Sequence, residues 1–147
     1  YLALNMGQIA RTKLLGALRL VTQMEKHLLA AGRIKPNLDH GGPHRALSRL
    51  YFQAPGWPTS IGSRSKAKEQ AKLALKASPN YPGNHLNLLE ILLRDGSSIA
   101  LRKQSEATIR SMKVSREVLN TPYWKYSWIE WESRLEGFQA ELDKRLN

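Results

Sequence analysis

The sequence predicts an all-α protein in which helical hairpins stack as a short α-solenoid of about six or seven helices, closed by a long C-terminal capping helix. Apolar residues recur with helical spacing in nearly every segment, and turns rich in proline and glycine separate these segments. No stretch alternates polar and apolar residues for long enough to compete as a strand. A chain of 147 residues is one domain by size, so we expect a single domain over residues 1–147.

The first segment, residues 1–31, has apolar residues at helical spacing, and the pattern is interrupted near Gly16. We expect one or two helices there, with Gly32 as the C-cap, because glycine readily takes the left-handed conformation of the position that ends a helix. Residues 33–42 then form a connecting loop. The next helix begins at Pro43, since proline suits the first turn of a helix.

This second helix is expected to stop at Ala54, because the proline that follows disfavours α geometry at the residue before it. Residues 54–63 form an inserted loop. Ser63 is the predicted N-cap of a helix over residues 64–77, since its hydroxyl can accept a hydrogen bond from the first turn. Pro79 lies in the turn that follows this helix.

The C-terminal part is predicted to hold three helices, over residues 84–94, 98–120 and 121–147, with turns at 95–97 and at Thr121-Pro122. In the last helix six apolar residues follow spacings of 4, 3, 4, 3 and 4 and therefore share one face. Such a stripe is typical of a helix that covers the exposed end of a solenoid. The six residues are Trp124, Trp128, Trp131, Leu135, Phe138 and Leu142.

An internal repeat supports the hairpin interpretation. Three alanines in the helix over residues 64–77 share one face, which lets a neighbouring helix pack closely, and a proline follows them. With two apolar positions in the preceding helix, this is the pattern of a tetratricopeptide repeat (TPR) of about 34 residues. A second unit continues from residue 82 and matches less well. The residues of the first unit are Leu47, Tyr51, Ala67, Ala71, Ala74 and Pro79.

Two longer motifs give a sharper resemblance. The run DHGGPHRALSRLY at residues 39–51, followed by APGWP at 54–58, resembles the D-x-G-G-P-x-R-x-L-G-x-L-Y…A-P-G-W-P pattern of the TRAP transporter T-component family, which is bacterial and TPR-like. ASPNYP and NHL, within residues 77–86, match a later stretch of that pattern. The resemblance covers about residues 1–110, whereas Ser48 departs from the usual glycine and the last helix matches nothing in the family.

The resemblance implies a periplasmic or outer-membrane-anchored helical-repeat protein, often a lipoprotein. Members of the family associate with a solute-binding partner of a transport system and can form oligomers. A signal peptide or lipid anchor would lie before Tyr1.

The charge is strongly basic and unevenly distributed. The chain has 23 Lys plus Arg against 12 Asp plus Glu, for a net charge of +11. Residues 1–80 carry 13 basic and 3 acidic side chains, whereas residues 81–147 carry 10 and 9. Such an excess indicates either a solvated face or an acidic partner, such as an acidic protein, an anionic membrane or a nucleic acid. Four cations that recur every four residues form a candidate partner-binding ridge: Arg64, Lys68, Lys72 and Lys76.

The Gly-Gly-Pro turn and the residues around it are a candidate site. Asp39 could accept backbone N–H bonds while Arg45 bridges to a carbonyl or carboxylate, which would make the segment a stiff turn. Alternatively, the helix N-terminus beside His44 and Arg45 could bind a small anion. His40 and His44 flank the turn and do not share a helical face, so we expect no metal site there.

Four tryptophans are further candidates for contact with a partner. Trp57 lies between two prolines in the inserted loop, where it can face a partner or fold back over its own helix pair. Trp124, Trp128 and Trp131 either cap the solenoid or form an interface with another chain.

The sequence favours a binding protein over an enzyme. It has no cysteine and therefore no disulfide or thiol chemistry, and it shows no phosphate-binding loop, dinucleotide fingerprint or nucleophile elbow. We expect no cofactor and no membrane-spanning segment. The leading hypothesis is a non-catalytic TPR-like scaffold that binds a protein partner, as an accessory component of an envelope transport system or a larger assembly. The alternative is a basic repeat protein that binds nucleic acid or another polyanion.

Overall fold

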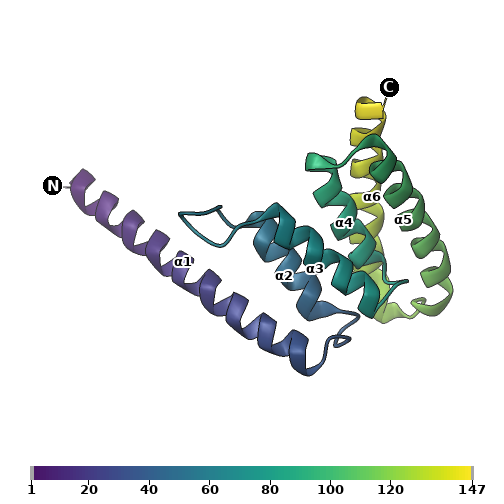
Figure 1. The fold of residues 1–147 in the computed structure, drawn as a ribbon, viewed down its shortest axis with the longest axis horizontal. Coiled ribbons are helices and arrows are strands. Elements are labelled where there is room, and N and C mark those ends of the chain that lie inside the picture. Colours follow the sequence, from purple (N-terminus) through teal and green to yellow (C-terminus); the bar gives the residue numbers. More distant parts are fainter. Residues whose placement is uncertain (1, 147) are drawn as a thin grey trace.

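The computed structural model describes residues 2–146, and these residues form an all-α, solenoid-like helical-repeat fold (Figure 1). The described part of the chain holds six α-helices, one short 3-10 helix and no strand, which confirms the predicted fold class. None of its helices is both long and apolar enough to cross a membrane. The elements are α1 (Leu2–Ile34), α2 (Gly42–Gln53), α3 (Arg64–Ala77), α4 (Pro82–Asp95), α5 (Ser98–Val118), η1 (Pro122–Trp124) and α6 (Lys125–Leu146).

The helices are arranged in two layers. Each helix from α1 to α5 packs on the next one along the chain, and α2, α4 and α6 also contact one another in that order. Within the described residues, α1 makes no close backbone contact with α3, and α3 makes none with α5. The even-numbered helices α2, α4 and α6 therefore form a continuous inner layer, and we call α1, α3 and α5 the outer layer.

α1 differs from the expectation at two of its three glycines, Gly16 and Gly32. It is one helix of 33 residues that continues through Gly16, and it ends at Ile34, so the prediction that Gly32 caps it is wrong. Gly32 is buried, and a Cβ atom there would lie 3.3 Å from the His44 ring of α2. The glycine therefore serves the close approach of two helices, and Pro36, two residues beyond Ile34, marks the end of the helix.

The N-terminal part of α1 extends past the other helices (Figure 1). Its C-terminal part is held on α2, where Leu28 and Leu29 pack against the core. The Tyr51 hydroxyl of α2 donates a 2.7 Å hydrogen bond to the Glu25 carboxylate of α1. Burial and the nearby Glu25 carboxylate raise the pKa of Tyr51, so this hydroxyl stays a donor at all ordinary pH values.

The α2–α3 hairpin matches the prediction closely. α3 spans the expected residues, and the Ser63 hydroxyl caps it by accepting a 3.3 Å hydrogen bond from the Lys66 amide. The three alanines on one face of α3 are fully buried against the core. Beside them, the buried Ser48 hydroxyl of α2 donates to the Ala67 carbonyl at 2.8 Å. Small side chains thus let these two helices lie close together.

The C-terminal helices share a larger, leucine-rich core that α6 covers. α4 begins two residues earlier than predicted, α5 ends at Val118, and a 3-10 turn precedes α6. Trp128 and Trp131 of α6 are buried against Leu86 of α4 and Met112 of α5. The prediction that α6 packs through its apolar stripe is therefore confirmed.

Candidate functional site

The turn before α2 has an unusual backbone, because three consecutive residues take left-handed conformations. Asp39, His40 and Gly41 have φ values of 46°, 53° and 80°. Asp and His tolerate this region at some cost, whereas glycine takes it freely. A Cβ atom on Gly41 would also lie 2.9 Å from the Ala74 carbonyl oxygen. Glycine is therefore required here both by the conformation and by the close approach to the end of α3.

Arg45 of α2 fixes this turn to the helix. Its guanidinium donates to the Asp39 carboxylate at 2.7 Å and to the carbonyls of Asp39 and His40 at 3.2 Å. It also donates to the Asn84 side-chain carbonyl at 3.2 Å. Arg45 thus bridges to carbonyl and carboxylate oxygens, as the stiff-turn interpretation describes, and the Asp39 carboxylate accepts its hydrogen bond from Arg45.

Asn84 of α4 joins the two hairpins. It is fully buried, and its amide donates to the His40 carbonyl at 2.9 Å and to the Ala74 carbonyl at 3.0 Å. Both acceptors belong to the first half of the chain. We call Asp39, Arg45 and Asn84 the latch, since their hydrogen bonds connect the turn, α2, the end of α3 and α4.

The structure does not bring the three residues of the predicted anion site together. His44 lies away from the latch, packs over Gly32, and has its Nδ1 atom 2.8 Å from the Gln70 side-chain oxygen of α3. Arg45 is engaged by oxygen atoms of the chain itself. The arrangement therefore matches the stiff turn and not the anion site.

An aromatic cluster lies beside the latch. The His40 ring stacks on Tyr81 with centroids 4.6 Å apart and planes 4° apart, and the Arg45 guanidinium carbon is 4.8 Å from the Tyr81 centroid. Trp124 meets the edge of His40 at 5.7 Å, and Trp131 meets Tyr81 at 5.2 Å. Burial raises the pKa of Tyr81, with Arg45 acting against it, so the phenol stays protonated at neutral pH.

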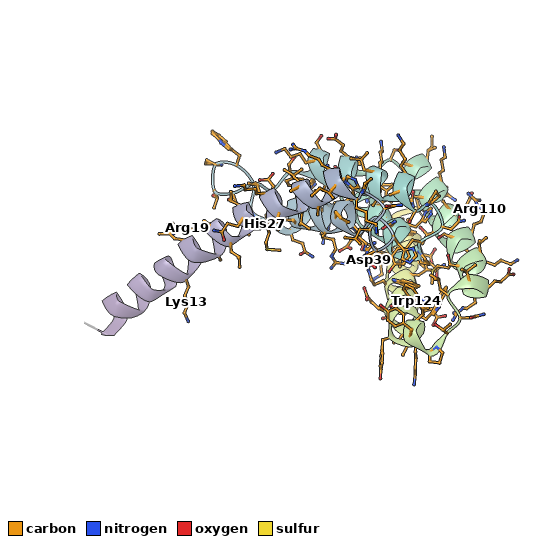
Figure 2. The ribbon with its side chains drawn as sticks, turned by 90° about the horizontal axis from the view of Figure 1, so that it is seen from below. Lys13, Arg19, His27, Asp39, Arg110 and Trp124 are labelled. Atoms are coloured by element: carbon orange, nitrogen blue, oxygen red, sulfur yellow. The ribbon has the colours of Figure 1, made fainter. Side chains whose placement is uncertain are left out.

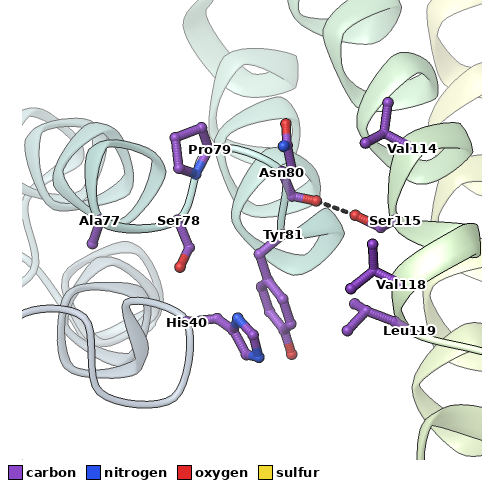
Figure 3. A pocket seen from close by; sticks show the side chains of 10 residues that line it. All are labelled: His40, Ala77, Ser78, Pro79, Asn80, Tyr81, Val114, Ser115, Val118 and Leu119. Atoms are coloured by element: carbon purple, nitrogen blue, oxygen red, sulfur yellow. Dashed lines mark hydrogen bonds between the residues drawn. The ribbon is translucent and has the colours of Figure 1, made fainter. Parts of the chain in front are cut away.

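A pocket of about 300 Å³ opens next to the stacked rings (Figure 3). The rings form one side and residues of α5 form the other, and the turn between α3 and α4 lies between them. Val114 and Val118 line the pocket, although 50% and 74% of their surfaces are exposed. The ten lining residues are His40, Ala77, Ser78, Pro79, Asn80, Tyr81, Val114, Ser115, Val118 and Leu119.

Two serine hydroxyls of α5 bond to the turn that lines the pocket. The hydroxyl of Ser115 donates to the Asn80 carbonyl, as the dashed line in Figure 3 marks, and Ser111 donates to the same oxygen at 2.8 Å. Both hydroxyls therefore hold the wall of the pocket in place. Among the described residues, no group of three or more His, Cys, Asp or Glu could hold a metal ion.

Trp57 does not fold back on its helix pair, so that alternative is wrong. It is 89% exposed at the inserted loop. The loop is closed at its base, where the Gly62 amide donates to the Pro55 carbonyl and the Ser63 amide donates to the Tyr51 carbonyl, each at 2.8 Å. Trp57 is thus held on a closed loop with its indole in water.

The other three tryptophans belong to the interior. Trp128 and Trp131 are buried, and the Trp128 indole N–H donates to the Leu119 carbonyl at 2.6 Å. Trp124 is half-buried against His40 and Tyr81. These positions match the alternative in which the tryptophans cap the solenoid, because other residues of this chain cover their indoles.

The ridge on α3 lies at the surface. Arg64, Lys72 and Lys76 are exposed, and Lys68 is half-buried with its ammonium 3.7 Å from the Asp95 carboxylate of α4. The helix contains one acidic residue, Glu69, so its cations are largely uncompensated within α3.

The sequence did not single out Val114 and Val118 as pocket residues. Helical spacing does not mark them as pocket residues, since Val118 lies seven residues after the buried Ser111 and so points nearly the same way.

A scan of protein-family models finds none that matches the chain, and a search of curated proteins finds no match either.

Proposed function

We propose that this chain is a non-catalytic, TPR-like scaffold that binds a protein partner through the pocket between the His40–Tyr81 stack and α5. The observation that carries the proposal is the exposure of Val114 and Val118 beside these rings. Apolar side chains that line a concave site with few polar groups are typical of binding sites. The resemblance supports a periplasmic or outer-membrane-anchored scaffold that acts as an accessory component of an envelope transport system or a larger assembly.

The rigidity of the site supports a docking role. The latch holds one side of the pocket, and the hydrogen bonds to the Asn80 carbonyl hold the other side against α5. A preformed site loses little conformational entropy when a partner binds. An apolar side chain of the partner would fit between the stacked rings and the two valines.

The proposal favours binding over catalysis because the polar side chains of this region already form hydrogen bonds within the chain. The hydroxyls of Ser111 and Ser115 donate to a carbonyl. His85, on the adjacent helix, has its Nε2 atom 2.6 Å from the Pro79 carbonyl oxygen.

The test is capture of the partner from the source cells in mild detergent, with quantitative mass spectrometry of the proteins that co-elute. We expect a solute-binding or other envelope protein at fixed stoichiometry. Val118→Glu should lower its recovery at least tenfold, since a carboxylate in an apolar contact costs roughly 2 kcal/mol or more. Ile129→Glu, the same change at an exposed position of α6, is the matched control and should leave recovery unchanged.

Equal recovery with both variants would refute the pocket as the docking site. The basic ridge offers a second check, because we expect Lys68→Glu with Lys72→Glu to weaken capture if the partner is acidic. Thermal unfolding followed by circular dichroism shows that each variant is still folded.

A second candidate function, binding to a polyanion, is favoured by the placement of the cations. If nucleic acid is the ligand, the logarithm of the binding constant should fall linearly with the logarithm of the salt concentration.

A further inference from the structure

The net charge of the chain follows the two layers of the fold. The outer-layer helices α1, α3 and α5 carry 15 Lys plus Arg and 4 Asp plus Glu. The inner-layer helices α2, α4 and α6 carry 7 of each. Because the two charged residues outside the helices, Lys35 and Asp39, cancel, the outer layer accounts for the whole net charge of +11.

Except for the half-buried Lys68, the outer-layer cations whose side chains the structure describes are exposed, and they are spread along the molecule. Of the outer-layer cations in the described residues, three form ion pairs with carboxylates: Lys68, Arg110 and Arg116. Figure 2 shows Lys13 and Arg19 on the projecting part of α1, while Arg110 lies at the opposite end of the molecule. The surface is therefore an extended field of positive charge and not a single groove.

Large apolar side chains are exposed on the same helices. α1 exposes Leu15, Leu20 and Met24, and α5 exposes Ile99 and Ile109 besides the pocket valines. Leu15 is 66% and Ile99 is 82% exposed. Of the inner-layer helices, α2 and α4 expose no large hydrophobic side chain within the described residues, and α6 exposes Tyr126 and Ile129.

Trp57 extends this pattern to α3. The inserted loop leads directly into α3, and it carries the most exposed of the large hydrophobic side chains described. Each outer-layer helix therefore presents cations together with an exposed apolar group on the helix or on the loop that enters it.

We infer that the outer layer of α1, α3 and α5, with Trp57, is a docking surface for an anionic phospholipid membrane. Lysine and arginine are attracted to anionic headgroups, while neighbouring apolar side chains and tryptophan enter the boundary between headgroups and acyl chains. A membrane surface thus satisfies both kinds of side chain. The protein-binding pocket borders this surface, since Val114 and Val118 of α5 line it, but binding to a membrane goes beyond the proposed scaffold function.

The exposed aliphatic side chains favour a membrane over nucleic acid. A phosphate backbone offers no apolar surface for Leu, Ile and Met, and nucleic-acid sites pair cations with stacking aromatic rings instead. The headgroups of a membrane are mobile and can gather around cations that are spread over three separate helices. A rigid acidic protein could contact all of these cations only if its shape were complementary to the outer layer.

The test is co-sedimentation of the whole chain with vesicles of phosphatidylcholine, with and without phosphatidylglycerol. We expect binding to the anionic vesicles that weakens with added salt, and none to the neutral ones. The informative variant is the triple charge reversal Lys72→Glu, Lys76→Glu and Lys103→Glu in the outer layer. The matched control is Arg49→Glu, Arg94→Glu and Lys144→Glu, which changes the net charge equally but in the inner layer.

Each cation near an anionic membrane is worth roughly a factor of five in partitioning. The outer triple variant should therefore lose about 100-fold or more, and the inner triple variant should stay within a few fold of the wild type. An equal loss of vesicle binding in both variants would overturn the inference, because binding would then depend on the net charge of the chain and not on the outer layer. Binding to an oligonucleotide but not to the anionic vesicles would overturn it in favour of nucleic acid.

Trp57 gives an independent readout. Addition of anionic vesicles should shift the tryptophan emission of the wild type to shorter wavelength, because the exposed indole leaves water. The shift should disappear in Trp57→Ala, while the folded state, monitored by circular dichroism, is unchanged. A shift of the same size in Trp57→Ala would show that this loop does not enter the interface.

Discussion

The two hairpins of this protein are built from the same alternation of inner and outer helices, but different side chains hold them together. In α2–α3 the contact is made by fully buried alanines and by the hydrogen bond from Ser48 to the Ala67 carbonyl. In α4–α5 large side chains fill the space, and the indoles of α6 complete it. Small side chains fix the distance between two helices, whereas large ones need a third helix to exclude water.

The latch joins these unlike halves, because the buried Asn84 of α4 bonds to carbonyls of the turn and of α3. Four variants, taken from the largest expected effect to the smallest, test whether the two halves depend on the contacts described.

Trp131→Ala should have the largest effect, since it removes the central indole from the core under α6. We expect a loss of about 3 to 5 kcal/mol in the free energy of unfolding. Urea denaturation followed by circular dichroism measures it. Tyr126→Ala, on the exposed side of the same helix, should cost less than about 0.5 kcal/mol. If both variants unfold at the same urea concentration, α6 is not what stabilises the second hairpin.

Asn84→Ala should cost about 3 kcal/mol, because it removes the hydrogen bonds that the buried Asn84 side chain makes to the His40 carbonyl, the Ala74 carbonyl and the Arg45 guanidinium, each worth roughly 1 kcal/mol. The same denaturation experiment applies. Asn120→Ala removes an exposed side chain that bonds only to the nearby Glu117 carbonyl, and it should be close to neutral. A small loss for Asn84→Ala would mean that the hairpins are joined by apolar contact alone.

Ala71→Leu should destabilise the first hairpin by about 1 to 3 kcal/mol, because the larger side chain does not fit between α2 and α3. Ala140→Leu, the same change at an exposed position of α6, is the control and should have little effect. Equal stability of the two variants would contradict the role that we give to the alanines.

His85 provides the smallest effect, as a dependence on pH. Burial lowers the pKa of His85 below its usual 6.5, while the hydrogen bond to the Pro79 carbonyl opposes the shift and Arg110 reinforces it. The unfolded chain therefore binds the proton more tightly, and stability should fall as the pH drops below about 6.5. Urea denaturation at several pH values should show a weaker decline for His85→Gln, whereas His27→Gln, on the exposed side of α1, should behave as the wild type.

The sequence predicted those features that depend on neighbouring residues. The span of α3 follows from Ser63 before it and from the turn with Pro79 after it, and the burial of the alanines follows from their spacing. Gly32 was misinterpreted, because its role is a contact with His44 of another helix. A rule for helix ends that considers only neighbouring residues cannot predict a contact with another helix.

The site could be predicted only in part, for the same reason. The role of Arg45 follows from a cation placed next to a turn that carries a carboxylate. The stacking of His40 on Tyr81, and the approach of Trp124 to both, bring together three segments far apart in the chain. The packing of α2 on α4 brings His40 to Tyr81, and the packing of α6 on α4 brings Trp124 to both, and helical periodicity carries no information about either contact.

The separation of α1, α3 and α5 has a mechanical consequence. Within the described residues α1 contacts α2 alone, so its angle to the rest of the molecule depends on a single helix–helix contact. α3 and α5 are held more firmly, because the latch ties the end of α3 to α4 and the indoles of α6 pack on Met112 of α5. The cations of α1 can therefore shift relative to those of α3 and α5 while the latch stays closed and the indoles stay covered.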